Sequence, residues 1–101
     1  MGVQAVRAAA RQDLYVQRFC GAWLEALRSY DEKNGTALYE TALCYVRCHG
    51  DAALAAKHLF QHPNTVRYRM QKAKALLCGE GTEDRAFYEQ LYLCTFLHGD
   101  L

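Results

Sequence analysis

The sequence contains one proline, Pro63, and no long uninterrupted run of apolar residues. A membrane-spanning helix needs about 20 apolar residues in succession, and no stretch of the chain approaches that length. The opening stretch MGVQAVRAAARQDLYVQ also lacks the apolar centre of a secretory signal. We therefore expect a cytoplasmic protein that is not inserted in a membrane.

Paired cysteine motifs are absent as well. The chain has five cysteines, an odd number, and none lies in a C-x-x-C pair, which argues against a zinc ribbon and against a disulfide framework. The nearest approach to a metal arrangement is Cys44, Cys48 and His49, but a tetrahedral site would need further ligands. We expect small hydrophobic cysteines in a reducing compartment, with no metal and no cofactor.

Catalytic motifs are equally scarce. The sequence shows no nucleophile–base spacing, no phosphate-binding loop and no pair of carboxylates at catalytic spacing. We expect that the chain is not an enzyme.

The residues that are present predict one small helical domain. The 101 residues are 51% apolar and 23% charged, which is typical of a globular chain. Sustained alternation of apolar and polar residues is missing, so strands are not expected. We predict an all-α domain of five helices around a central helix-turn-helix, of the winged-helix-like or Fis-like type without strands. The expected helices span 14–30, 36–49, 52–60, 63–77 or 78, and a segment from shortly after Thr82 to Leu97. Residues 1–13 are expected to be an extension or the tail of an upstream segment, and residues 14–101 the domain itself.

Capping residues mark where three of these helices begin. Thr36 and Asp51 are suitable N-caps for the second and third helices. His62 can cap the fourth, with Pro63 in its first turn, where the missing N–H of proline is no loss. The last helix differs from the others because apolar residues surround most of its circumference, so we expect it to be enclosed in the core or packed on a second subunit.

Charge is distributed unevenly although the formal net charge is only +1. Residues 57–76 contain five basic side chains and no acidic one, whereas 31–56 and 77–101 are net acidic. At 100° per residue, the fourth helix places Val66, Met70, Ala73 and Leu77 on one stripe that should face the core. The expected outward side carries Pro63, Asn64, Arg67, Tyr68, Gln71, Lys72 and Lys74, with Thr65 and Arg69 on its flanks.

This mixture of side chains suits DNA. Arginine and lysine neutralise phosphates, while asparagine, glutamine and threonine form hydrogen bonds with phosphates or base edges. The alanine-rich helix, the short turn and the polar start of the next helix together favour a helix-turn-helix with a recognition helix at about 63–77. The alternative is a solvated helix face whose cations keep a small domain soluble.

The residues also carry a resemblance to a known family. The run from Leu38 to Leu77 resembles the C-terminal helix-turn-helix domain of PucR/CdaR-type bacterial transcription regulators, which control purine catabolism and the use of sugar diacids. The resemblance covers about 19–97 and is strongest over 36–77, where the stretch HPNTVRYR matches the family's H-x-N-T-x-x-Y-R pattern. Pro63 departs from it, because the family commonly has a basic or polar residue there.

The resemblance implies double-stranded DNA as the partner, and an upstream ligand-sensing domain in the full-length protein. By position it implies a DNA-contacting set, in which the basic residues contact phosphates and Asn64, Thr65 and Tyr68 contact base edges or position the helix. The expected set is Lys57, His62, Asn64, Thr65, Arg67, Tyr68, Arg69 and Lys72. His62 and Tyr68 have the alternative of packing or capping roles.

Two interpretations of the whole chain follow. The first is a sequence-specific DNA-binding domain that acts as a homodimer, with the last helix and the first, which contains Trp23, as candidate dimer surfaces. The second is a protein-interaction or dimerisation module that has lost sequence-specific contact with DNA, an interpretation favoured by Pro63 and by the near-zero net charge.

Overall fold

A computed structural model describes residues 14–79 and 81–97 of the chain. The predicted extension 1–13 lies outside these residues. Five helices are present: α2 (Leu14–Asn34), α3 (Leu38–Arg47), α4 (Ala52–Leu59), α5 (Pro63–Cys78) and α6 (Asp84–Leu97). Since the described part contains no strand, the predicted all-α class is confirmed. No helix in that part is both long and apolar enough to span a bilayer.

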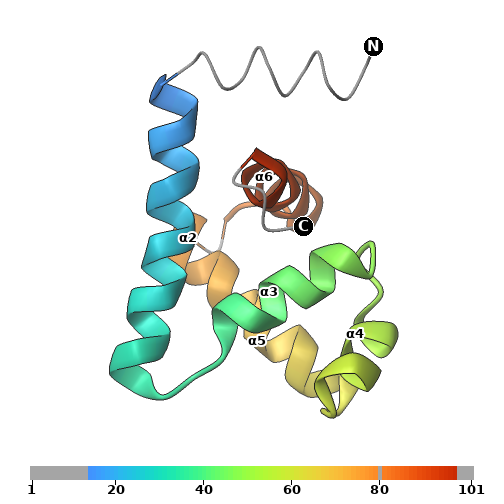
Figure 1. Ribbon diagram of the computed structural model, residues 1–101. Helices are drawn as coiled ribbons and strands as arrows, with labels where there is room; N and C mark the ends of the chain where they lie inside the picture. Colours follow the sequence, from blue (N-terminus) through green and yellow to red (C-terminus); the bar gives the residue numbers. More distant parts are fainter. Residues whose placement is uncertain (1–13, 80, 98–101) are drawn as a thin grey trace.

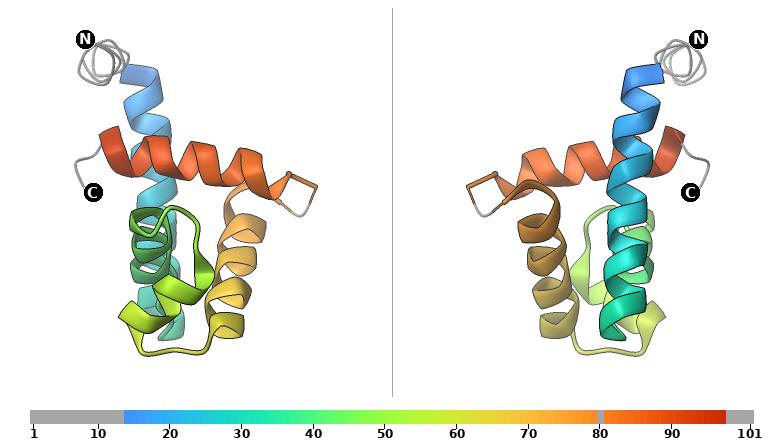
Figure 2. Two further views of the ribbon diagram at one scale, coloured as in Figure 1. Left: turned by 90° about the vertical axis from the view of Figure 1, so that its right-hand side faces the viewer. Right: turned by 90° about the vertical axis from the view of Figure 1, so that its left-hand side faces the viewer.

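The helices form a bundle with two distinct ends. Figure 1 shows α2 standing beside α3, with α5 behind them, and Figure 2 shows α6 lying across the bundle. The turn between α4 and α5 lies at the end of the molecule away from α6, as does the loop that follows α2. The turn of the helix-turn-helix and the last helix therefore lie at opposite ends, although the later part of α5 contacts α6.

The core lies between these two ends. Leu27 of α2, Val46 of α3, Val66 of α5 and Leu91 of α6 are all fully buried. Two alanines of α4, Ala55 and Ala56, are buried, and α4 packs on α5. Because a methyl side chain occupies little space, these positions allow the two helices of the helix-turn-helix to approach closely.

Of the three predicted N-caps, Asp51 and His62 are confirmed, whereas Thr36 is not a cap. The Asp51 carboxylate accepts a hydrogen bond from the Leu54 N–H at 3.1 Å, as predicted. Thr36 does not cap α3, which begins after Ala37 without a side-chain cap from that residue. Asp31 supplies the acceptors instead: its carboxylate accepts from the N–H groups of Leu38 and Tyr39, both at 2.8 Å.

Asp31 belongs to the last turn of α2, beyond the apolar segment 14–30, and the helix stops at Asn34-Gly35, the residues in the sequence that tolerate positive φ. Gly35 adopts a φ of 64° there. This last turn places the Asp31 carboxylate against the start of α3, and the Thr36 hydroxyl donates to that same carboxylate at 2.5 Å. One acidic side chain therefore satisfies the N-terminal amides of the next helix across the turn.

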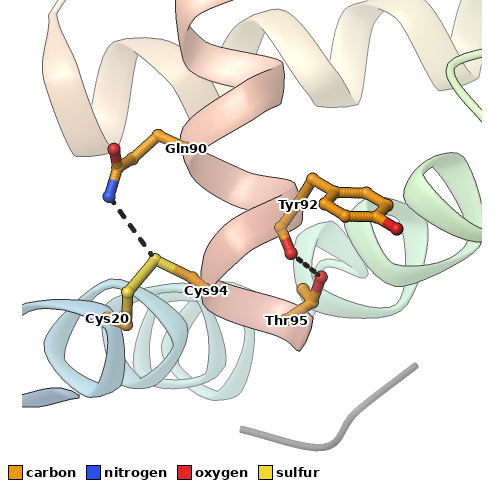
Figure 3. The surroundings of a disulfide bond; sticks show 5 residues. All are labelled: Cys20, Gln90, Tyr92, Cys94 and Thr95. Atoms are coloured by element: carbon orange, nitrogen blue, oxygen red, sulfur yellow. Dashed lines mark hydrogen bonds between the residues drawn. A yellow bond between two sulfur atoms is a disulfide. The ribbon is translucent and has the colours of Figure 1, made fainter. Parts of the chain in front are cut away.

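The cysteines give a second correction. Cys20 of α2 and Cys94 of α6 are paired as a disulfide between two fully buried positions (Figure 3). The expectation that the cysteines form no disulfide was wrong, because 74 positions separate the pair in sequence and only the crossing of the two helices brings them together. The remaining three, Cys44, Cys48 and Cys78, are free thiols.

Helix α6 presents one face to the core and another toward solvent. Phe87, Leu91 and Cys94 are buried, whereas the ring of Tyr92 is 40% exposed. The exposed side carries a row of aromatic rings, with Tyr92 stacked on Phe96 at 6.4 Å between centroids. The enclosure of α6 is therefore partial, and packing on a second subunit stays a prediction.

Candidate nucleic-acid interface

The turn between α4 and α5 has a defined backbone. At the end of α4 the Gln61 N–H donates to the Ala56 carbonyl at 2.9 Å, and the Phe60 N–H donates to the Lys57 carbonyl at 3.3 Å. These two bonds form a Schellman pattern, which requires a residue in the left-handed region. Phe60 occupies that position with φ 57° and ψ 43°. The pattern stops α4 and redirects the chain toward α5.

His62 and Pro63 then start α5 as predicted. His62 is extended, and its Nδ1 accepts a hydrogen bond from the Asn64 N–H at 3.0 Å. A neutral imidazole that accepts at Nδ1 carries its proton on Nε2, so Nε2–H of this exposed residue is a donor at the beginning of α5. The N–H groups of Asn64, Thr65 and Val66 all donate to His62, the first to its Nδ1 and the other two to its carbonyl, so His62 closes the first turn of α5.

The two sides of α5 are divided largely as the sequence predicts. Val66, Met70 and Ala73 are buried. Leu77 is half-buried. The predicted outward residues that prove exposed are Asn64, Arg67, Tyr68, Gln71 and Lys72.

The cations of this exposed face have no acidic partner. Among the described residues, no carboxylate lies within ion-pair distance of Lys57, Arg67 or Lys72. Arg67 instead donates from Nη1 to Oδ1 of Asn64 at 3.0 Å, which orients both side chains along the helix. We call Lys57, His62, Asn64, Arg67, Tyr68 and Lys72 the basic face.

Two predicted contact residues lie partly inside the fold. Thr65 and Arg69 are half-buried and line a cleft between α5 and the α2–α3 loop. Arg69 donates from Nη1 to the hydroxyl of buried Thr41 at 3.2 Å, so its guanidinium points toward α3. Lys72 lies on the rim of the same cleft, with Nζ 5.9 Å from the centre of the Tyr30 ring. The cleft therefore joins the basic face to the end of α2.

Lys74 does not belong to the outward side on which the sequence placed it. It is only 8% exposed, and its Nζ forms an ion pair with Asp84 Oδ1 at 2.7 Å. Hydrogen bonds from Lys74 and from Gln71 lower the pKa of the Asp84 carboxyl. Helical periodicity alone gave the wrong side for Lys74, because α6, which begins at Asp84, packs against α5 and covers this position. Lys74 joins two helices instead of facing a partner.

Sequence reasoning missed Phe60. Its side chain lies next to the basic face and is 93% exposed. The available signal was the absence of glycine or asparagine where α4 ends, because these residues normally occupy a left-handed helix terminus.

The other cluster that the sequence singled out does not converge. Cys48 is buried, Cys44 is half-buried and His49 is exposed, with a φ of 55°. Burial, followed by the neighbouring Cys48, raises the pKa of the Cys44 thiol, so it stays protonated near neutral pH. Within 14–79 and 81–97, no three His, Cys, Asp or Glu side chains are close enough together to hold a metal ion.

The basic face is made of cations and hydrogen-bonding side chains. It combines one cation of α4 and two of α5 with an amide, a phenol and an imidazole, all of them exposed. Such a set neutralises phosphates and forms hydrogen bonds in a groove. The geometry is therefore that of a surface for a polyanion.

Comparison with known proteins agrees with this geometry. The family described as the PucR C-terminal helix-turn-helix domain matches residues 38–93, from the start of α3 through most of α6. Over 54 residues the chain is 39% identical to uncharacterized proteins of Mycobacterium bovis and Mycobacterium tuberculosis. These alignments cover 54% of this chain but only 13% of each relative. No solved structure is significantly similar to the chain.

Proposed function

The chain belongs to the family of PucR C-terminal helix-turn-helix domains, and we propose that it is the DNA-binding domain of a bacterial transcription regulator. In this proposal α5 (Pro63–Cys78) is the recognition helix and enters the major groove of double-stranded DNA, while α4 lies against the phosphate backbone. The observation that carries the proposal is the basic face, whose exposed cations have no carboxylate partner among the described residues.

We assign each exposed residue of the basic face to a phosphate or to a base edge. Lys57, Arg67 and Lys72 are exposed long cations and are assigned to phosphates. Asn64 and Tyr68 are exposed near the beginning of α5 and are assigned to base edges. The Arg67–Asn64 hydrogen bond supports this division, because a phosphate contact by the guanidinium would hold the amide in register.

The other three predicted contact residues are His62, Thr65 and Arg69. His62 holds the first turn through Nδ1 and offers Nε2–H to a phosphate at the helix start. Thr65 and Arg69 line the cleft beside α5, where Arg69 is tied to Thr41. We assign these two to positioning of the helix.

The proposal extends to the protein that would contain this domain. We propose a longer regulator, with an upstream domain that senses a small molecule, acting as a homodimer on the bacterial chromosome in the cytoplasm. The length of the relatives supports the first point, since the matched segment is a small part of each. Two domains on neighbouring half-sites would bind more tightly through their effective concentration.

A second candidate function is a protein-interaction module. Pro63 favours it, because proline offers no N–H and no polar side chain at the first position of α5. A module of this kind would assemble with a protein partner and leave DNA unbound.

Binding to duplexes as a function of salt separates the two functions. We expect fluorescence anisotropy to show binding of duplexes selected from a random pool, with an affinity that falls steeply as salt rises. Replacing both Arg67 and Lys72 by alanine should reduce the magnitude of the log–log salt slope by about two. Arg85→Ala, which removes an exposed cation of α6, is the matched control and should leave the slope unchanged. Absence of binding to any duplex at modest salt would reject the DNA-binding proposal.

A further inference from the structure

Phe60 is the most exposed large apolar side chain in the described part of the chain. Its 93% exposure compares with 44% for Phe19 and about 40% for Leu54, Leu76 and Tyr92. Burial of a phenyl ring is a main source of folding stability, and Phe60 gains almost none of it. The ring therefore contributes little to the stability of the isolated domain.

The backbone of Phe60 is also unfavourable for a residue with a side chain. Its φ of 57° and ψ of 43° lie in the left-handed region, where the Cβ of an L-residue is crowded and where glycine or asparagine is the usual choice. Both the strain and the exposure would disappear with glycine. A strained and exposed aromatic residue is a signature of a position kept for contact with something else.

The surroundings of Phe60 identify the kind of partner. Lys57 lies one helical turn before it, and the basic face of α5 begins two residues after it at His62. A purely apolar protein surface would leave the adjacent imidazole of His62 and amide of Asn64 without hydrogen-bond acceptors. Duplex DNA offers phosphates and base-edge acceptors to these residues and one apolar group in the major groove, the thymine methyl.

We infer that Phe60 is a specificity-determining residue that packs against a thymine methyl group in the major groove, at the edge of the site read by α5. The inference rests on the proposed function, because it requires the beginning of α5 to enter the groove. Phe60 stands in the left-handed turn that ends α4, three residues before α5 begins, and it is almost fully exposed. The phenyl ring has no hydrogen-bonding group, so a methyl is the base-edge feature that it can distinguish.

Two substitutions separate the ring from its backbone. Phe60→Gly removes both ring and strain, and should raise Tm by a few degrees while weakening duplex binding. Phe60→Leu keeps an apolar side chain and the strain, and should retain most of the affinity. A gain in stability together with a loss in affinity would be expected only of a residue kept for binding.

Single replacement of thymine by deoxyuridine tests the contact itself. The probes are duplexes selected from a random pool by the protein, with each thymine of the bound site replaced in turn. One replacement should weaken wild-type binding about fourfold, because that is the loss of affinity expected when one buried methyl group is removed. The same replacement should have no effect on Phe60→Gly, while the slope of affinity against salt stays that of the wild type.

The outcomes are distinguishable. If the wild type binds no duplex, the proposed function fails and the inference falls with it. If the wild type binds but every deoxyuridine replacement affects wild type and Phe60→Gly equally, the inference is overturned while DNA binding stands. An equal loss of affinity for thymine and deoxyuridine duplexes in Phe60→Gly would likewise overturn it, since it would place the ring on the sugar–phosphate backbone.

Discussion

The α4–α5 end of the domain and the contact between α2 and α6 use their side chains in opposite ways. At the α4–α5 end, Lys57, Arg67 and Lys72 are exposed, and Phe60 is both exposed and strained. Where α2 meets α6, Cys20 and Cys94 are fully buried and joined as a disulfide, and Trp23 packs on Phe87 at 5.8 Å between ring centroids.

The difference separates stability from binding. Substitutions at the α2–α6 contact should reduce the free energy of unfolding without changing how a folded molecule meets a duplex. Substitutions on the basic face should do the reverse. The predictions below test this separation, from the largest expected change to the smallest.

The disulfide should give the largest loss of stability. Cys20→Ser removes the cross-link between positions 74 residues apart, and a loop of this size corresponds to about 4 kcal/mol of unfolding free energy. Urea unfolding followed by the fluorescence of Trp23 measures the change. Cys78→Ser, at a free thiol, is the control and should change stability much less. Thiol titration of the unfolded, unreduced protein should find three thiols; a count of five would contradict the pairing.

Leu91 tests the same region without sulfur chemistry. Its side chain is fully buried in α6, and Leu91→Ala should cost about 3 kcal/mol through lost burial and the cavity left behind. Leu76→Ala removes the same atoms from a position on α5 that is 42% exposed, and it should cost well under half as much. Similar losses in the two variants would show that the core is not distributed as described.

Asp31 belongs to neither of these two contacts, because it connects the end of α2 to the start of α3. Asp31→Ala leaves the N–H groups of Leu38 and Tyr39 without their acceptor, and loss of an N-cap costs about 1 to 2 kcal/mol. Glu32→Ala, at the exposed neighbouring position, should be nearly neutral. Equal effects of the two substitutions in urea unfolding would argue against the capping role of Asp31.

The pH dependence of stability should show the smallest effect. Hydrogen bonds from Lys74 and Gln71 lower the pKa of Asp84 in the folded state, so the carboxylate stabilises the fold above its unfolded pKa of about 3.9. That contribution is lost as pH falls through the lower folded-state pKa. Because the Asp84 side chain is 71% exposed, solvent and salt screen the ion pair and keep the effect small.

Asp84→Asn should therefore flatten the acid limb of the stability profile slightly. Glu83→Gln serves as the control, because Glu83 is an exposed neighbour that forms no ion pair with any residue in the described part of the chain. If Asp84→Asn leaves the acid limb unchanged, the Lys74–Asp84 ion pair does not contribute to the pH dependence of stability.

Local signals made much of the fold predictable. The Asp51 cap, the His62–Pro63 start and the left-handed glycine after α2 each depend on residues within a few positions of one another. The apolar stripe of α5 follows from helical periodicity alone. These features could be recognised without knowing what packs against them.

The features that escaped prediction all depend on distant residues or on a local rule that is broken. Asp31 replaces Thr36 as the cap because the last turn of α2 brings its carboxylate across the loop to the start of α3. Cys20 meets Cys94, and Lys74 meets Asp84, only after α6 folds across the bundle. Phe60 occupies a position where glycine is expected. Periodicity within one helix contains no information about such contacts.

The separation of the two regions is tested most directly by mapping backbone amide chemical shifts during titration with a selected duplex. We predict that the largest shifts fall on residues 57–72, in α4, the turn and the beginning of α5, while amides of α6 from Leu91 to Leu97 barely move. Large shifts confined to α6, with the amides of 57–72 unchanged, would contradict the account and place the binding surface at the wrong end of the domain.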